Sequence, residues 1–396
     1  MLSLEHLNTG LGSLVVFRNL LSLPFLRKLR ELFFVLEKGG DPVPVYGEFI
    51  SELYPEGGDF GNLLYRSVLE DENFYIKKAA CRKVPEIDVC LKEELKLLQS
   101  LSDITSEILK EAISEVSEYN GYLPEYRTTA HDFIGGYMER IENLRQQGFG
   151  IYSKYHVFTI VDGAITPVKH PDSQRLSTLS SYERERGLVI GNTLNLLEGR
   201  PAGNVLLYGD AGTGKSATVK AVANEYKDRG LRLIEVKKQQ LNKLPDIIGE
   251  LSENPLKFII FIDDLTFMSN DDNFSALKAI LEGSVSVFGD NVVIYATSNR
   301  RHLVKESMTD RAGDDIHLSD TIQETMGLAS RFGLNITFLR PDKETYLKIV
   351  KDLAAEYDLH LPDDVLYVRA EAYALRNGGR SPRTAKQFVQ LEKGKA

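Results

Sequence analysis

The spacing of apolar and polar positions changes character three times along the chain. Up to about residue 150 the apolar positions recur at helical spacing, most clearly over 91–116 and 129–147, which predicts a mostly helical N-terminal region. Residues 151–168 then hold two β-rich runs on either side of a Val-Asp-Gly turn, which predicts a hairpin. From residue 180 short apolar runs alternate with helical segments, and after Pro341 only helical spacing continues.

The alternating part of the chain predicts a P-loop type α/β fold with a five-stranded parallel sheet. Strands are expected at 205–208, 232–236, 258–262, 292–297 and 336–338, and helices after them at 343–357, 363–375 and 382–391. Strands separated by helices at this spacing pair in parallel through right-handed crossovers. We therefore expect a mostly helical region with a hairpin over 1–172, a nucleotide-binding α/β domain over 173–340, and a helical lid over 341–396.

Length, composition and charge narrow the class of protein. A chain of 396 residues with 42% apolar and 27% charged residues is typical of a soluble protein with two or three domains. The net charge of −9 argues against a protein that coats DNA non-specifically. The two cysteines, Cys81 and Cys90, suit neither a disulfide framework nor a zinc site, which favours a cytoplasmic location.

The apolar segment 11–37 is interrupted by charged side chains. No uncharged run in it reaches the ~18 residues that a membrane-spanning helix needs. We expect no membrane span, and we expect this segment to pack in a core or to contact a partner. A helix lying at a membrane interface is the alternative.

A glycine-rich stretch between a predicted strand and a predicted helix carries the strongest chemical signal. It fits the pattern G-x-x-x-x-G-K-[ST], in which backbone N–H groups and a helix N-terminus bind phosphate. Its lysine can reach the β and γ oxygens, and its serine hydroxyl can complete a Mg²⁺ shell. The residues expected to bind the nucleotide phosphates are Gly209, Asp210, Ala211, Gly212, Thr213, Gly214, Lys215 and Ser216. A glycine-rich turn that matches by chance is the alternative.

Polar residues end two of the predicted strands, where ligands of open α/β sheets bind. Asp263 and Asp264 follow the strand 258–262. We expect Asp263 to hold Mg²⁺ through water and Asp264 to orient or deprotonate the attacking water. Asn299 follows the strand 292–297, whose tip is expected between the phosphate loop and Asp263, so it could contact the γ-phosphate or the water. A turn-forming asparagine is the alternative.

Together these elements resemble Walker A, Walker B and sensor 1 of the AAA+ ATPases, over residues 180 to 396. The run Leu328-Ala-Ser-Arg331-Phe-Gly is similar to the arginine-finger box, which implies that Arg331 reaches the γ-phosphate of a neighbouring subunit. The run Gly378-Gly-Arg380-Ser-Pro-Arg383-Thr-Ala is similar to sensor 2, which implies that Arg383 points at the phosphates, with Arg380 as the competing candidate. A helix C-cap and a solvated basic turn are the respective alternatives.

The resemblance also extends upstream and to a narrower family. Tyr182 lies in a segment similar to the one that wraps adenine in AAA+ proteins, with a core tyrosine as the alternative. The chain resembles the bacterial AAA+ family catalogued as domain of unknown function 815. The resemblance lies in the runs around Tyr182, the two acids, Asn299 and the two arginine boxes. Asp264 stands where the wider AAA+ pattern has Glu, which implies a shorter reach and a slow ATPase. Glu282 is a distant substitute for the missing glutamate.

These features predict a homo-oligomeric ATPase that uses ATP and Mg²⁺ and couples hydrolysis to remodelling or loading a partner macromolecule. Residues 1–172 are expected to bind an unknown protein partner. A slowly hydrolysing switch or scaffold is one alternative. An initiator-like, DNA-associated ATPase is another, suggested by the run Ser330-Arg-Phe and by the seven Arg and Lys residues of 369–396, although the net charge of −9 weighs against it.

Overall fold

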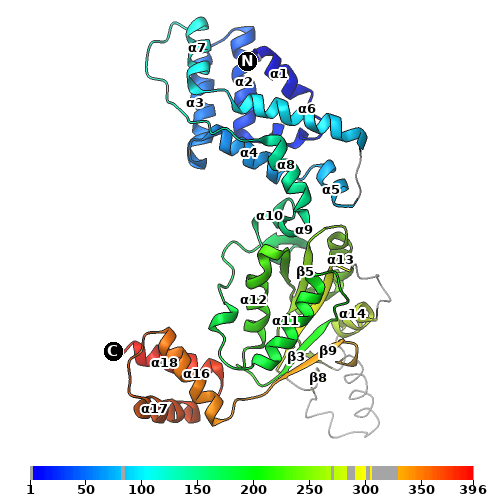
Figure 1. Cartoon of the computed structure of the whole chain (residues 1–396), viewed down its shortest axis with the longest axis vertical. Coiled ribbons are helices and arrows are strands. Elements are labelled where there is room, and N and C mark those ends of the chain that lie inside the picture. The colour runs from blue at the N-terminus through cyan, green and yellow to red at the C-terminus, as the bar shows by residue number, and fades with distance from the viewer. Residues whose placement is uncertain are drawn as a thin grey trace. The chain divides into compact units, whose positions relative to one another are not determined.

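The computed structural model of the chain describes residues 3–81, 85–268, 272–282, 290–299, 304–305 and 329–395. The chain divides into two compact units, Met1–Ser153 and Lys154–Ala396 (Figure 1). Each unit buries apolar side chains in cores of its own.

The first unit is helical, as predicted. Its helices pack mainly around a large core to which the segment 11–37 contributes Leu26, Leu29 and Phe33, and a smaller cluster holds Ile76, Leu144 and Phe149. This burial accounts for the apolar character of that segment. In the described part of the chain, no helix combines the length and apolar character needed to cross a bilayer. The helices are α1 (Leu4–Gly12), η1 (Arg18–Ser22), α2 (Pro24–Lys38), α3 (Pro42–Leu53), η2 (Tyr54–Glu56), α4 (Phe60–Glu70), α5 (Phe74–Cys81), α6 (Pro85–Ser102), α7 (Ser106–Val116), α8 (Phe133–Glu142), α9 (Leu144–Gln147) and α10 (Ile151–Lys154), the last of which ends at the unit boundary.

The predicted helix over 91–116 is wrong at its centre. The chain forms two helices, α6 and α7, separated by residues 103–105. Thr105 begins α7 as its N-cap, because its hydroxyl accepts a hydrogen bond from the N–H of Ile108. The apolar spacing continues across the break, with Leu101 and Ile104 both buried, so periodicity alone did not reveal it.

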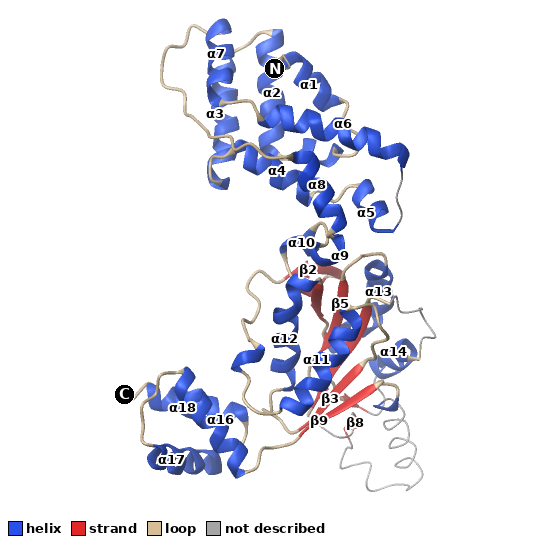
Figure 2. Ribbon diagram, viewed as in Figure 1, coloured by secondary structure: helices blue, strands red, loops and turns tan. Residues whose placement is uncertain are grey.

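The second unit is built on a sheet of seven strands in the order β2-β1-β4-β5-β7-β3-β9 (Figure 2). All neighbouring strands pair in parallel except the β1–β2 hairpin, which is antiparallel. The five predicted strands are present. The strands of this sheet are β1 (Val157–Val161), β2 (Ala164–Pro167), β3 (Val205–Gly209), β4 (Leu231–Glu235), β5 (Lys257–Ile262), β7 (Val292–Ser298) and β9 (Leu334–Phe338), and a separate short pair is β6 (Phe267–Met268) with β8 (Val304–Lys305).

The hairpin enlarges the sheet beyond the five strands that we expected. Strand β1 pairs with β4, with Val157 opposite Leu233, and buries Phe158 completely. This pairing covers the edge of β4, whose backbone groups would otherwise be open. The hairpin therefore lies in the second unit, and the boundary falls after Ser153 rather than after residue 172.

Two helices cover one face of the sheet and share a core with it. Buried side chains of α11 and α12, such as Val189 and Val222, pack with Leu207 of β3 and Tyr295 of β7. Because β7 lies between β5 and β3, the ends of these three strands meet at one edge, as the sequence predicted. The helical elements of this part are η3 (Leu176–Thr178), α11 (Glu183–Leu197), α12 (Lys215–Tyr226), η4 (Lys227–Arg229), η5 (Lys238–Lys243), α13 (Leu244–Ser252) and α14 (Asp272–Leu281).

Three helices form the predicted lid after β9. They are α16 (Lys343–Glu356), α17 (Asp363–Arg376) and α18 (Pro382–Lys393), drawn in orange and red in Figure 1. Their core includes Tyr346, Leu366 and Phe388. Residues 339–342 join β9 to α16 and thus form the connection between the sheet and the lid.

Candidate nucleotide site

The glycine-rich stretch forms the loop between β3 and α12, in the setting that phosphate binding requires. At Gly209, where φ is 128°, an added Cβ would lie 2.2 Å from the carbonyl oxygen of Phe338, so strand β9 passes too close for a side chain. The N–H of Asp210 donates to the same carbonyl at 3.0 Å. The loop is thereby attached to the end of β9, and its far end leads into the first turn of α12.

Lys215 is the first residue of α12 and is almost fully buried, with 5% of its surface exposed. Its Nζ donates to the carbonyl oxygens of Gly209 at 3.2 Å and Asp210 at 2.7 Å. Burial lowers the pKa of Lys215, and the neighbouring carboxylates Asp210 and Asp263 act in the opposite direction. A buried ammonium group held by neutral carbonyls is suited to take an anionic partner.

Ser216 and Asp263 bring together the oxygen ligands that Mg²⁺ prefers. The Ser216 hydroxyl donates to Oδ1 of Asp263 at 2.6 Å, which joins the first turn of α12 to the residue after β5. Within the described residues no group of three or more His, Cys, Asp or Glu side chains could hold a metal ion. A hydroxyl and one carboxylate fit a Mg²⁺ ion that keeps several waters and takes phosphate oxygens, rather than one enclosed by protein ligands.

Asp264 and Asn299 are in direct contact at the same edge of the sheet. Nδ2 of Asn299 donates to Oδ1 of Asp264 at 2.8 Å. Asp264 has a left-handed backbone with φ of 52°, which turns the chain immediately after β5. The two residues that the sequence assigned to the attacking water thus lie together, while their roles stay predictions.

Thr297 is a site residue that the sequence reasoning did not identify. Its hydroxyl donates to Oδ1 of Asp263 and accepts from the N–H of Asp264 at 2.9 Å. Only 1% of Thr297 is exposed. The available signal was the strand register: Ala296 is paired with Ile262, which puts the next residue of β7 beside the first aspartate. Thr297 therefore lines the cavity and also holds both acids in position through its hydroxyl.

Replacing Thr297 by Val is expected to raise the Mg²⁺ concentration that ATP binding requires by about ten-fold, because outer-shell partners of metal ligands typically contribute 10- to 100-fold in metal affinity. The check is the Mg²⁺ concentration that gives half-maximal ATP binding. Thr297→Ser keeps the hydroxyl and serves as the matched control. Equal Mg²⁺ requirements for Thr297→Val and the wild-type chain would show that the hydroxyl does not position the metal ligand.

The lid contributes Arg383 to the site and directs Arg380 elsewhere. Arg380 forms a two-pronged ion pair with Glu371, from Nε at 2.9 Å and Nη2 at 2.7 Å. Arg383 lies in the first turn of α18, and its N–H donates to the carbonyl of Gly212 at 3.2 Å. Of the two arginines that competed in the sequence, only Arg383 borders the site.

Arg331 lies outside the site of its own chain. Its Nε donates to Oε1 of Glu282 at 2.6 Å, and it is not among the described residues that border the cavity. The same ion pair occupies Glu282, which does not border the cavity either. Leu328, the first residue of the predicted arginine box, falls outside the described residues. Action of Arg331 on a neighbouring subunit stays a prediction.

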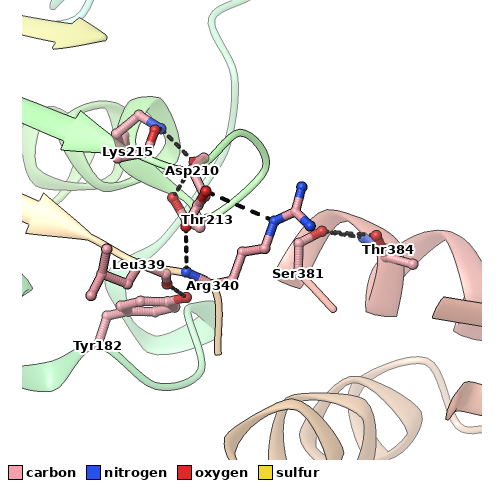
Figure 3. A network of polar contacts seen from close by, with 9 residues as sticks. Tyr182, Asp210, Thr213, Lys215, Leu339, Arg340, Ser381 and Thr384 are labelled. Carbon is pink, nitrogen blue, oxygen red and sulfur yellow. Dashed lines mark hydrogen bonds and ion pairs between the residues drawn. The ribbon is translucent and has the colours of Figure 1, made fainter. Parts of the chain in front are cut away.

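A cavity of about 570 Å³ is lined by residues 212–216 of the loop, by both acids, by Asn299 and by Arg383. Tyr182 is at its border, where the ring stacks on Phe338 at 5.4 Å and the hydroxyl donates to the carbonyl of Leu339 at 2.6 Å (Figure 3). Burial raises the pKa of Tyr182 above its ordinary value. Tyr182 is thus both packed on the sheet and placed at the cavity. Further border residues that sequence reasoning did not identify are Gln174, Thr178, Leu179, Arg186, Ile349, Leu353, Glu356 and Lys386.

The chain is similar to one described family and to several solved structures. Residues 153–396 match the family described as "Protein of unknown function (DUF815)". Among solved structures, the RuvB Holliday junction branch migration motor of Thermotoga maritima is 16% identical, with a TM-score of 0.36 over 55% of this chain and 63% of that one. Two substituted forms of the same RuvB give 15% and 17% identity, each with a TM-score of 0.38 over 55% of this chain, and cover 64% and 63% of their own chains. The matched part therefore spans less than two thirds of these RuvB chains.

Proposed function

Because the chain belongs to the family described as "Protein of unknown function (DUF815)" and carries its glycine-rich loop between a parallel strand and a helix, we propose that it is an AAA+ protein that binds and hydrolyses ATP. One observation carries this proposal. A buried lysine, a hydroxyl paired with an aspartate, and a second acid paired with an asparagine border a single cavity. These groups suit the binding of a triphosphate and the activation of a water beside it.

The residues present fit ATP and Mg²⁺. The N–H groups of the loop 209–216 and the Lys215 ammonium would hold the phosphates, and Ser216 with Asp263 would hold Mg²⁺. A bound Mg²⁺ supplies charge neutralisation for phosphoryl transfer. Asp264 would accept the proton of the attacking water, and Asn299 would orient that water. Tyr182 and the apolar side chains Ile349 and Leu353 provide a surface for the base.

We further propose that the protein works as a homo-oligomer that remodels or loads a partner macromolecule. The position of Arg331 away from its own cavity supports a role toward a neighbouring subunit. The helical region before the sheet, within 1–172, is the proposed contact for a protein partner. A slow nucleotide-dependent switch is the second candidate. It is favoured by Asp264, whose side chain is one methylene shorter than the glutamate of the wider AAA+ pattern. The run Ser330-Arg-Phe and the basic segment 369–396 support a DNA-associated role.

Phosphate release from ATP, measured per chain over a series of protein concentrations, tests this proposal. A homo-oligomeric ATPase is expected to show a steep rise in rate as chains associate. A flat rate near zero together with tight ATP binding would favour the switch. Stimulation by DNA that falls with salt would favour the DNA-associated role.

A further inference from the structure

We propose that Asp210 and Arg340 connect the phosphate loop to the hinge of the lid, so that nucleotide binding and lid position are coupled through this pair. The inference rests on the proposed function and adds a positioning role for two residues. Asp210 is the second residue of the loop, and Arg340 lies in the connection between β9 and α16. Figure 3 shows the two side chains meeting between the loop and the lid.

Asp210 holds the hinge by its carboxylate and the lysine by its carbonyl. Its Oδ2 accepts a hydrogen bond from the backbone N–H of Arg340 at 2.8 Å. Its own carbonyl oxygen accepts from Nζ of Lys215 at 2.7 Å and from the hydroxyl of Thr213 at 2.8 Å. One residue thus joins the phosphate-binding lysine to the start of the lid connection.

The Arg340 side chain also connects the loop to the lid. Its Nε lies 3.9 Å from Oδ1 of Asp210. Its Nη1 lies 2.8 Å from the place that a Cβ on Gly379 would take, so the guanidinium rests against the turn between α17 and α18. Gly379 has φ of 99°, and a side chain there would displace the arginine. Arg340 therefore contacts the loop and the lid at once.

Two further contacts restrict how the hinge and lid can move. The carbonyl of Leu339 accepts from the hydroxyl of Tyr182, so the adjacent hinge residues Leu339 and Arg340 are held by the start of α11 and by the loop. At the loop, a Cβ on Gly212 would lie 3.1 Å from Cβ of Arg383. The lid cannot change its position relative to the loop without altering the Asp210 or Gly212 contacts.

Lys215 links phosphate binding to the contacts that hold the hinge. A phosphate that attracts the Lys215 ammonium competes with the carbonyl of Asp210 for it, and the loop then rearranges at the residue that holds the hinge. Coupling of this kind is reciprocal: whatever the nucleotide does to the lid, the lid does to nucleotide affinity. Removing the Asp210 carboxylate should therefore change both the position of the lid and the affinity for the nucleotide.

The test compares Asp210→Ala, which removes the carboxylate, with Asp210→Asn, which keeps an acceptor for the Arg340 N–H. ATP affinity is measured by calorimetry, and hydrogen exchange of residues 338–345 and 376–386 is measured with and without ATP. In the wild-type chain ATP is expected to slow exchange in both segments. Asp210→Ala should lose this effect and bind ATP about ten-fold more weakly, since a hydrogen bond to a charged group has that order of effect. Asp210→Asn should retain the slowed exchange.

Arg340→Ala, with Arg340→Lys as its conservative partner, tests the side chain independently of the loop. It should reduce the ATP-dependent change in exchange at 376–386 while leaving the change at 338–345 in place. The matched control is Arg376→Ala, an exposed arginine at the end of α17 that should behave as wild type. Unaltered ATP affinity and unaltered lid protection in Asp210→Ala would overturn the coupling alone. A wild-type chain that binds no ATP would overturn the proposed function and the coupling together.

Discussion

Arg331→Ala is expected to lower the ATP turnover of the assembled protein by about 10³- to 10⁵-fold, the range contributed by an arginine that stabilises the transition state from a neighbouring subunit. The structure supplies the reason for expecting action on a neighbour. Arg331 is paired with Glu282 and does not border the cavity of its own chain. ATP binding by single chains should be unchanged, because Arg331 is not among the described residues that line the cavity. Phosphate release and ATP affinity are the two measurements.

Mixing two inactive variants distinguishes action on a neighbour from action within one chain. Arg331→Ala chains have an intact site, and Lys215→Ala chains have an intact Arg331. If Arg331 acts on the next subunit, the mixture should regain part of the turnover that neither variant shows alone. No recovery in a mixture that assembles normally would contradict a role for Arg331 between subunits.

Asp264→Asn is expected to reduce turnover by about 10²- to 10⁴-fold while ATP binding is retained, because general base catalysis contributes in that range. An amide cannot accept the proton of the attacking water, yet it keeps the size of the carboxyl group beside Asn299. The Mg²⁺ ligands Ser216 and Asp263 are not altered. The measurement is the single-turnover rate at saturating ATP, with ATP affinity determined on the same samples.

The companion variant Asp264→Glu restores the side chain that the wider AAA+ pattern has at this position. Its added methylene extends the reach of the carboxylate, so turnover should equal or exceed that of the wild-type chain. Normal turnover by Asp264→Asn would mean that another group activates the water. A loss in Asp264→Glu similar to that in Asp264→Asn would mean that the site is shaped for the shorter acid.

Much of the fold was predictable because its signals are local. The five parallel strands and the three lid helices follow from short apolar runs and helical spacing, and the structure has them near the expected residues. The position of the hairpin was not predictable in this way, because the pairing of β1 with β4 joins residues far apart in the chain. The break before α7 was missed for a different reason. Thr105 is a good N-cap, but the apolar spacing continues through it.

Within the candidate site, too, the residues with local sequence signals were predicted and the residues without them were missed. Lys215, Ser216, Asp263 and Asp264 belong to motifs with fixed spacing, and the structure brings them to one cavity. Thr297 was missed because a threonine at the end of a strand has the same appearance as any β-branched strand residue. Its role depends on the register between β5 and β7.

The two candidate arginines of the lid were also beyond sequence reasoning. Arg380 and Arg383 lie in the same short run, and sequence could not separate them. The partner of Arg380 is Glu371, which lies on the preceding helix and holds the guanidinium away from the cavity. Arg383, in contrast, borders the cavity through the first turn of α18.

Calorimetric titration of ATP with Mg²⁺ into the wild-type chain and into Lys215→Ala tests the central claim most directly. The buried ammonium is the positive group that the loop offers to phosphate, so one ATP should bind per wild-type chain. Lys215→Ala should bind about a hundred-fold more weakly, as expected for the loss of a buried charged partner. Lys215→Arg, which keeps the charge but not the shape, is the informative intermediate. Equal ATP affinity in Lys215→Ala and wild type, or no binding by the wild-type chain, would contradict the assignment of this loop as an ATP site.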